Sequence, residues 1–372
     1  MTGSIMLAAG GTGGHVFPAQ VLAAELDRRG RAVDIVTDRR GDDYSDRFPG
    51  QTIHRIAAAT PSGQGFIGKF VATALIAQGT LQARRLIRKT SPAVVVGFGG
   101  YPTLPTMLAA ITLSVPRMLH EQNAVLGRVN RLIAARVDAI ATSFPVTRSL
   151  PENDNQPNFV TGNPVRDEVR ALAVMSYELP GLDDPFKLLI FGGSQGASGF
   201  SNVIPHALMA LPKSYRQRLS VVQQCRQEDL EFVQRLYVKN DIQAETASFF
   251  DDLPNRLATA HLVIARSGAG TVSELAVAGR PSVLVPYPHA TDDHQTRNAE
   301  VLSSVGGAWV LPEAEMTVER LSQNLAKLMD QPDLLKNAAE AAHGRGYPNA
   351  AGLLADVVEA LAANKLDEKA GA

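Results

Sequence analysis

The chain has 372 residues, a length that on its own suggests two domains. Hydrophobic residues make up 45% and charged residues 20% of the sequence, as in an ordinary globular protein with complete cores. The single cysteine, Cys225, excludes an internal disulfide, and a net charge of −1 without aromatic residues among the basic ones argues against nucleic-acid binding.

Sequence features also predict where the protein resides. The N-terminal residues MTGSIMLAAGG lack the basic start and long apolar middle of a signal peptide. No apolar run approaches the ~20 residues needed to cross a bilayer. The lone cysteine fits a reducing compartment, where we expect it to be a small buried residue. We therefore expect a cytoplasmic protein that is soluble or peripheral to a membrane.

Short apolar segments alternate with segments of helical spacing along the whole chain. In the first half, strands are expected over Ile5–Ala9, Ala32–Thr37, Ala93–Gly97, Arg117–His120 and Ala139–Thr142. In the second half, strands are expected over Lys187–Phe191, Leu219–Gln223, Leu262–Ala265 and Ser282–Pro286. Segments such as Pro18–Arg29 and Thr271–Ala278 are expected to be helices. This alternation predicts an α/β fold of parallel sheets, with ligands at the carboxyl ends of the strands.

The two halves differ in charge, and a turn-rich region near residues 164–184 separates them. Residues 1–165 hold 17 Lys and Arg against 11 Asp and Glu, whereas the remainder holds 19 against 26. No acidic residue occurs between Asp46 and Glu121, a stretch that contains eight basic residues. We expect the basic N-terminal half to face something anionic.

Three glycine-rich turns directly follow predicted strands: Ala9–His15, Gly97–Pro102 and Phe191–Ala197. Glycine lets the backbone approach a ligand, and the free N–H groups at a helix start favour an anion. The first turn lacks the third glycine of a dinucleotide-binding G-x-G-x-x-G, because residue 16 is valine, and it lacks the Gly-Lys-Ser/Thr of a P-loop. Three such turns in one chain favour diphosphate binding over plain strand–helix turns.

A fourth segment, Arg266–Glu274, leaves two interpretations open. Thr271 and Glu274 have the spacing of a helix capping box, in which Glu274 would fold back on the helix start. Alternatively, the two carboxylate oxygens of Glu274 would accept hydrogen bonds from both hydroxyls of a ribose.

Seven motifs then occur in order across nearly the whole chain: GGTGGHVFP, GFGGYP, HEQN, GNPVR, GGSQGA, SGAGTVSEL and DHQTRNA. Together they resemble the UDP-N-acetylglucosamine–N-acetylmuramyl-(pentapeptide) pyrophosphoryl-undecaprenol N-acetylglucosamine transferase family of bacterial cell-wall synthesis. The resemblance implies a GT-B fold, two Rossmann-like parallel-sheet domains facing across a cleft. It implies an N-terminal acceptor and membrane-binding domain over 1–163, joined by a C-terminal helix at about 345–372, and a UDP-sugar-binding domain over 164–344.

The activity implied is inverting transfer of N-acetylglucosamine from UDP-N-acetylglucosamine to the C4 hydroxyl of the muramyl sugar of lipid I, giving lipid II. Phe250 departs from the family, which often has an aliphatic residue there and uses the backbone near uracil. The resemblance implies substrate contacts by Thr12, Gly13, Gly14, Asn123, Arg166, Ser194, Phe250, Ala269, Gly270, Thr271, Val272, Ser273, Glu274 and Gln295. Arg166 would help the helix after Gly192-Gly193-Ser194 to receive the pyrophosphate.

Inverting transfer needs a base for the acceptor hydroxyl. His15 is the first candidate, since histidines titrate near neutrality, although it would equally suit a contact with the acceptor diphosphate or support of its loop. Glu121 of the HEQN motif is a weaker candidate, for which we favour a structural role. No Asp-x-Asp occurs, and the neighbours Asp292, Asp293 and His294 converge poorly on one ion, so neither a metal nor another cofactor is expected.

The acceptor carries a polyprenyl tail, so the implied enzyme visits the cytoplasmic face of the inner membrane. Residues Phe66–Val71 lead into an apolar helical stretch, and the basic residues Arg84, Arg85, Arg88 and Lys89 follow. An apolar surface flanked by cations is typical of binding to anionic lipids. A buried helix with a solvated basic end stays open as the alternative. The resemblance also leaves other cell-wall synthesis proteins open as partners.

Two other functions remain to be discriminated. A nicotinamide-dependent oxidoreductase would use the first glycine turn, with Asp38 as the ribose acceptor. A non-catalytic UDP-sugar-binding protein would need the same donor contacts without a base or a lipid-binding surface.

Overall fold

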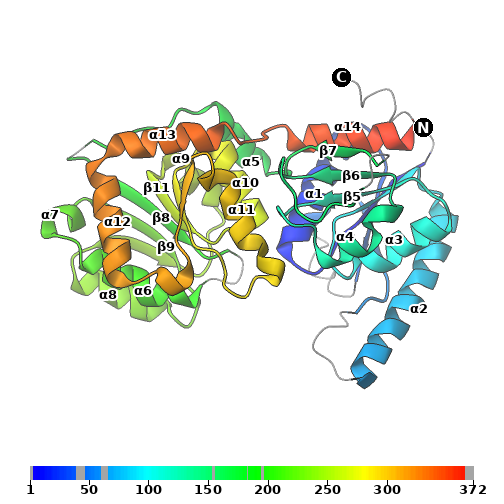
Figure 1. The fold of residues 1–372 in the computed structure, drawn as a ribbon, viewed down its shortest axis with the longest axis horizontal. Coiled ribbons are helices and arrows are strands. Elements are labelled where there is room, and N and C mark those ends of the chain that lie inside the picture. Colours follow the sequence, from blue (N-terminus) through cyan, green and yellow to red (C-terminus); the bar gives the residue numbers. More distant parts are fainter. Residues whose placement is uncertain are drawn as a thin grey trace. The chain divides into compact units, whose positions relative to one another are not determined.

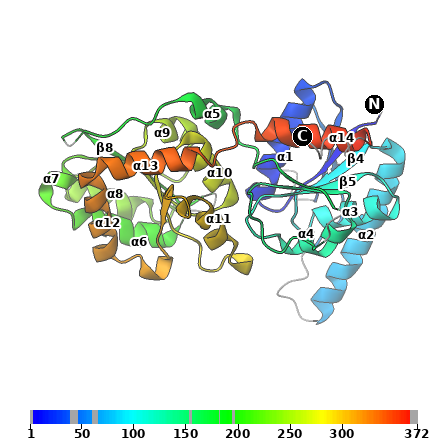
Figure 2. The same cartoon turned by 45° about the horizontal axis from the view of Figure 1, so that its top comes forward.

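The computed structural model describes residues 3–38, 47–59, 66–152, 156–181, 183–193 and 197–364. The chain forms two compact units: unit 1 is Met1–Val165 with Asn349–Ala372, and unit 2 is Arg166–Pro348. Each unit holds one parallel sheet with helices on its faces (Figures 1 and 2). The predicted α/β fold of two Rossmann-like domains is therefore confirmed.

The sheet of unit 1 has seven strands in the order β3-β2-β1-β4-β5-β6-β7. These are β1 (Ile5–Ala8), β2 (Val33–Thr37), β3 (Thr52–Arg55), β4 (Val94–Gly97), β5 (Arg117–Glu121), β6 (Ala139–Thr142) and β7 (Asn158–Val160). Strand β1 lies between β2 and β4, so successive connections run to opposite sides of β1. In such sheets, the point where the order reverses is the place where loops part and ligands bind.

The helices of unit 1 cover both faces of this sheet. Along β1, Ile5 and Leu7 join one apolar cluster with α1 (Gly13–Arg28) and α14 (Ala350–Ala362), whereas Met6 joins another with α2 (Phe66–Thr90) and α3 (Thr103–Thr112). This alternation follows from the strand period of two. The second face also holds α4 (Arg128–Ile133), which the short helix η2 (Ala134–Arg136) follows. Helix α2 projects beyond the sheet, with its N-terminal end farthest away (Figures 1 and 2).

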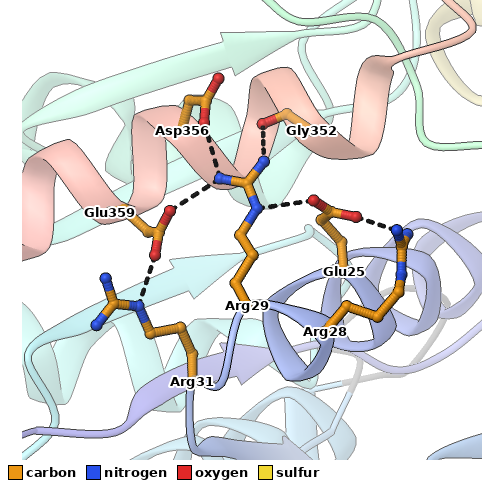
Figure 3. A network of polar contacts seen from close by, with 7 residues as sticks. All are labelled: Glu25, Arg28, Arg29, Arg31, Gly352, Asp356 and Glu359. Carbon is orange, nitrogen blue, oxygen red and sulfur yellow. Dashed lines mark hydrogen bonds and ion pairs between the residues drawn. The ribbon is translucent and has the colours of Figure 1, made fainter.

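A charged network fastens α14 to the end of α1 (Figure 3). The Arg29 guanidinium donates to Glu25 at 2.7 Å, to Asp356 at 2.7 Å, to Glu359 at 2.8 Å and to the carbonyl of Gly352 at 3.1 Å. The contacts with Asp356, Glu359 and Gly352 join segments more than 320 residues apart in the sequence. The last helix therefore belongs to unit 1, although all of unit 2 lies between it and the rest of unit 1 in the sequence.

The sheet of unit 2 has six strands in the order β10-β9-β8-β11-β12-β13. These are β8 (Phe186–Phe191), β9 (Leu219–Gln224), β10 (Gln243–Ala247), β11 (Leu262–Ala265), β12 (Ser282–Leu284) and β13 (Ala308–Val310). The longer helices are α6 (Ser198–Met209), α8 (Leu230–Lys239), α10 (Ala269–Ala278), α11 (His294–Ser303), α12 (Val318–Asp330) and α13 (Pro332–His343). Shorter helices are α5 (Asp167–Arg170), η3 (Ala171–Val174), α7 (Lys213–Arg216), α9 (Leu253–Thr259), η4 (Thr291–Asp293) and η5 (Glu313–Glu315). The order reverses at β8, which lies between β9 and β11.

The predicted elements correspond closely to those observed. All nine predicted strands are present within two residues at either end. Helix α1 begins at Gly13, five residues before the predicted start at Pro18, which lies inside the helix. Cys225 is buried as expected, and burial raises the pKa of its thiol to about 11. No helix of the described ranges combines the length and apolar character needed to span a membrane.

Candidate functional site

Two of the predicted glycine turns meet at the reversal point of the unit 1 sheet. They follow β1 and β4, which are adjacent strands. A Cβ on Gly10 would lie 2.9 Å from the Pro102 side chain, and one on Gly100, whose φ is +75°, would lie 3.0 Å from the Gly10 carbonyl oxygen. Glycine at these two positions is therefore explained by packing and by a left-handed backbone.

Gly14 is different, because nothing in the fold requires a glycine there. It is the second residue of α1, it is exposed, and a Cβ would meet only the Thr12 hydroxyl, in ordinary contact at 3.7 Å. Thr12 caps the helix with an extended backbone, yet its side chain makes no capping hydrogen bond. Thr12, Gly13 and Gly14 therefore form an open helix start, suited to close approach by an anionic group.

The reversal point of the unit 2 sheet repeats this arrangement. The turn after β8 contains Gly193 at φ +82°, and the turn after β11 leads through Gly268 into α10. Gly270 is the second residue of α10, is exposed, and would place a Cβ in open space. The two units thus share a strand, a glycine turn and an open helix start at their reversal points. Ser194, a predicted donor contact, lies outside the described residues.

Glu274 forms an ion pair with Arg166 and does not cap its helix. The N-cap of α10 is Gly268, so Thr271 lies inside the first turn and the capping-box interpretation is wrong. The Glu274 Oε1 atom accepts from Arg166 Nη2 at 3.0 Å and from Nε at 3.3 Å. Burial raises the pKa of Glu274, while the Arg166 charge acts against that rise. Within the described chain, Oε2 accepts no protein hydrogen bond and stays available to a ligand.

Two other predicted donor residues of unit 2, Phe250 and Gln295, have structural partners. Phe250 is buried beneath the Arg256 guanidinium, which lies 4.1 Å from the ring centroid. The Phe250 side chain is thus committed to packing, and the backbone of this residue is the part that remains for contact with a nucleobase. The Gln295 side chain accepts from the backbone N–H of Tyr287 at 2.9 Å and orders the segment after β12.

Glu121 organises the loop that follows β5. It is 1% exposed, and its two carboxylate oxygens accept hydrogen bonds from the backbone and side-chain nitrogens of Asn123, from the Gly127 N–H and from the Asn130 side chain, at 2.8–3.2 Å. Four donors leave little capacity to take a proton from a substrate. The geometry favours the structural role of Glu121 and places Asn123 within its loop.

His15 lies between the two glycine turns of unit 1. Its ring lies beside Gly99 and Gly100, and a Cβ on these glycines would come to 3.3 and 3.2 Å from the ring carbons. Its Nδ1 atom is 2.9 Å from the Oε1 atom of Gln122, which in turn contacts His120. Sequence reasoning did not single out His120 or Gln122, although the HEQN motif that contains them follows a predicted strand.

Arg266 is a third residue that sequence reasoning did not single out. It is 7% exposed, pairs with Glu313 at 2.8 Å, and donates to the carbonyl oxygens of Val285 and Pro286 at 3.2 Å. It therefore ties the turn after β11 to the segment after β12. An arginine within a glycine-rich turn was the available signal.

The structure thus gathers the predicted residues in two groups. Thr12, Gly13, Gly14, His15, Glu121 and Asn123 belong to unit 1, while Arg166, Phe250, residues 269–274 and Gln295 belong to unit 2. Asp292 and Asp293 lie on an exposed turn. In the ranges that the structure describes, no three His, Cys, Asp or Glu side chains gather as they would around a metal ion.

Comparison with known proteins adds independent evidence. Residues 5–142 match the glycosyltransferase family 28 N-terminal domain and residues 187–354 its C-terminal domain. The chain is 52% identical to the UDP-N-acetylglucosamine–N-acetylmuramyl-(pentapeptide) pyrophosphoryl-undecaprenol N-acetylglucosamine transferase of Rhodospirillum rubrum, over 98% of this chain and 93% of that one. The corresponding transferase of Rhizobium etli is 48% identical over 98% of this chain and 96% of its own length.

Among solved structures, that of Acinetobacter baumannii MurG is similar to this chain with a TM-score of 0.79 and 31% identity, and the match covers 96% of this chain and 99% of that one. Near-complete coverage by relatives of about half-identical sequence establishes common descent of both units. The protein belongs to glycosyltransferase family 28, and within it to the UDP-N-acetylglucosamine–N-acetylmuramyl-(pentapeptide) pyrophosphoryl-undecaprenol N-acetylglucosamine transferases.

Proposed function

We propose that the protein transfers N-acetylglucosamine from UDP-N-acetylglucosamine to the C4 hydroxyl of the muramyl sugar of lipid I, with inversion at the transferred carbon, and so makes lipid II for peptidoglycan. The observation that carries this proposal is the matched pair of open helix starts, at Gly14 and Gly270, where the fold itself does not require glycine. Open helix starts suit the close approach of anionic groups, and both substrates of this reaction carry a diphosphate.

Unit 2 binds the donor in this proposal. The free Oε2 atom of Glu274 accepts from the ribose hydroxyls, while Arg166 holds Oε1 and so orients the carboxylate. The start of α6 and the Arg166 charge stabilise the negative charge that develops on departing UDP. The remaining donor contacts are Ser194, the backbone near Phe250, residues 269–274 and Gln295, together with Thr12, Gly13, Gly14 and Asn123 of unit 1.

Unit 1 binds the acceptor and supplies the base. His15 takes the proton of the C4 hydroxyl as the hydroxyl oxygen bonds to the anomeric carbon and the bond to UDP breaks. UDP leaves with the electron pair of that bond, so the proton and the charges balance. An attack from the side opposite UDP inverts the anomeric carbon.

The test follows labelled N-acetylglucosamine from UDP to a lipid-linked muramyl-pentapeptide acceptor in buffer that contains a chelator. We expect transfer there, and we expect His15→Ala to keep near-normal affinity for UDP-N-acetylglucosamine while losing most turnover. His206→Ala, at an unrelated surface histidine, is the matched control. Donor binding without transfer would indicate a non-catalytic UDP-sugar-binding protein, and binding of NADH would favour an oxidoreductase. Intact turnover of His15→Ala would remove His15 from the mechanism.

Helix α2 provides the membrane contact in this proposal, which places the enzyme on the cytoplasmic face of the inner membrane. One exposed face of the helix carries Phe70, Ala74, Ala77 and Leu81 and continues into Arg85 and Arg88. Phe70 is 76% and Leu81 59% exposed. The apolar part lies toward the projecting end of the helix, and the cations follow toward the sheet, as an interfacial helix on anionic lipid requires. The Phe66 and Ile67 side chains lie outside the description.

Vesicle binding tests the membrane proposal separately from catalysis. Burying the Phe70 ring contributes about 1.5–3 kcal/mol, so Phe70→Ser should weaken binding to anionic vesicles by about tenfold or more. The double change at Phe66 and Phe70 should weaken it further. Val238→Ser is the matched control, because Val238 is 73% exposed on α8 in unit 2. Unchanged vesicle binding by correctly folded Phe70→Ser protein would refute the assignment.

A further inference from the structure

A chain of hydrogen bonds leads from the end of the β7 segment to His15. His120 Nε2 is 3.1 Å from the carbonyl oxygen of Gly162. The Gln122 amide nitrogen is 3.0 Å from His120 Nδ1 and 3.0 Å from the His120 carbonyl oxygen, and the Gln122 amide oxygen is 2.9 Å from His15 Nδ1. His120 and Gln122 are 0% and 1% exposed, so water does not compete for the bonds between these two side chains.

Two backbone carbonyls determine the direction of every bond in this chain. A carbonyl oxygen only accepts, so His120 Nε2 carries a hydrogen and donates to Gly162. The atom of Gln122 that faces the His120 carbonyl must likewise be the amide nitrogen. Burial lowers the pKa of His120 to about 4, so its ring is neutral and its Nδ1 atom accepts from the same amide nitrogen.

The direction at His15 then follows. With its nitrogen turned to His120, Gln122 presents only its amide oxygen to His15. His15 Nδ1 must therefore donate, and in a neutral imidazole the other nitrogen, Nε2, then holds the free electron pair. The absence of a Cβ at Gly99 and Gly100 leaves room for the ring in this position.

We propose that His120 and Gln122 are positioning residues that hold His15 in the Nδ1–H tautomer, so that Nε2 is unprotonated and ready to accept the acceptor proton. The proposal rests on the proposed function, in which His15 is the base. A histidine without such a partner favours the Nε2–H tautomer, which cannot accept a proton at Nε2. Gln122 is neutral and receives no proton itself. It keeps the same hydrogen bond to Nδ1–H when His15 becomes an imidazolium.

The tautomer is measured directly by NMR of protein labelled with nitrogen-15 in histidine, with the His15 signals assigned from His15→Ala. In the wild-type protein, at an alkaline pH where neutral imidazole is measured, we expect nitrogen shifts of the Nδ1–H form. In Gln122→Met, a substitution of similar length, we expect a shift toward Nε2–H and a fall in kcat of about tenfold, with KM for UDP-N-acetylglucosamine changed less than twofold. Gln82→Met is the control, since Gln82 lies on α2, accepts from the Ala57 N–H and is remote in sequence from this chain of bonds.

A wild-type His15 in the Nε2–H form would overturn the proposal, and this result requires no variant to fold. An unchanged tautomer in folded Gln122→Met would overturn it as well. Failure of the proposed function has a different signature, because His15→Ala would then keep turnover whatever tautomer the wild-type spectrum shows.

Discussion

The Arg29 network should make a measurable contribution to the stability of unit 1, and Arg29→Met tests it. The Arg29 side chain is 25% exposed and Glu359 is 20% exposed, whereas Asp356 is 47% exposed. Exposed ion pairs contribute about 0.2–1 kcal/mol each, so the Asp356 pair counts little and the Glu25 and Glu359 pairs count most. With the bond to the Gly352 carbonyl, we expect a loss of about 2 kcal/mol. Methionine retains most of the apolar stem and so isolates the guanidinium.

Urea unfolding followed by circular dichroism measures this loss. With a slope of about 2–3 kcal/mol per molar urea, the unit 1 transition should move down by roughly 0.7–1 M. The only tryptophan, Trp309, lies in β13 of unit 2, so its fluorescence reports the other unit and should change little. Arg28→Met is the matched control, because Arg28 is 51% exposed and, among the residues that the structure describes, pairs only with Glu25. If Arg29→Met unfolds at the same urea concentration as Arg28→Met, the network does not fasten α14.

Three further predictions concern pH, glycine and the donor site. Burial acts to raise the pKa of Glu359, but hydrogen bonds from Arg29 and Arg31 outweigh it and lower this pKa. The stability that the Glu359 carboxylate contributes is therefore complete above about pH 4.5 and disappears as the pH falls through the lowered pKa. The stability difference between wild type and Arg29→Met should accordingly shrink from pH 7 to pH 3 in urea titrations, and a constant difference would contradict this. Gly14→Ala and Gly270→Ala should keep or raise the melting temperature, since alanine is favoured over glycine in helices by up to about 1 kcal/mol. The rate of sugar transfer should fall at least tenfold in both variants, and full activity would show that no ligand approaches these two helix starts. Glu274→Gln should raise KM for UDP-N-acetylglucosamine about tenfold or more in steady-state assays, because hydrogen bonds to a charged acceptor contribute about 1.5–3 kcal/mol. An unchanged KM would exclude the contact between Glu274 and the ribose.

The strands that sequence patterns did not predict share one position in the fold. β3, β7, β10 and β13 are the outer strands of their sheets. Interior strands of a parallel sheet are buried on both faces and read as continuous apolar runs, as Val94–Gly97 does. Outer strands face water on one edge, and β10, with the sequence QAETA, has mainly exposed residues. β3 (TIHR) and β10 carry mainly polar side chains, whereas β7 (NFV) and β13 (AWV) are mainly apolar but three residues long. The apolar runs on which the predictions depended are therefore interrupted or very short where the sheets end.

The glycine turns were predictable because their function depends on local chemistry. A strand followed by glycines and a helix start is visible in a few consecutive residues, and the parallel topology brings such turns together at one edge. The role of Glu274 was not decided by its sequence, because a capping box and a carboxylate paired with Arg166 have the same local spacing. That decision required the position of α10, which begins two residues before Thr271.

The hydrogen bonds behind His15 show how an error at the sheet edge reaches the chemistry. HEQN was recognised as a motif, but its glutamate was considered for catalysis while its histidine and glutamine were not. Through His120 and Gln122, the carbonyl of Gly162 determines which nitrogen of His15 carries the hydrogen. Gly162 follows β7, one of the outer strands that the sequence patterns did not predict. Without β7 there was no acceptor to orient His120, and without an oriented His120 the amide of Gln122 has no preferred direction. The tautomer of the proposed base thus depends on a short edge strand more than 140 residues away in the sequence, which is why residue patterns near His15 did not reveal it.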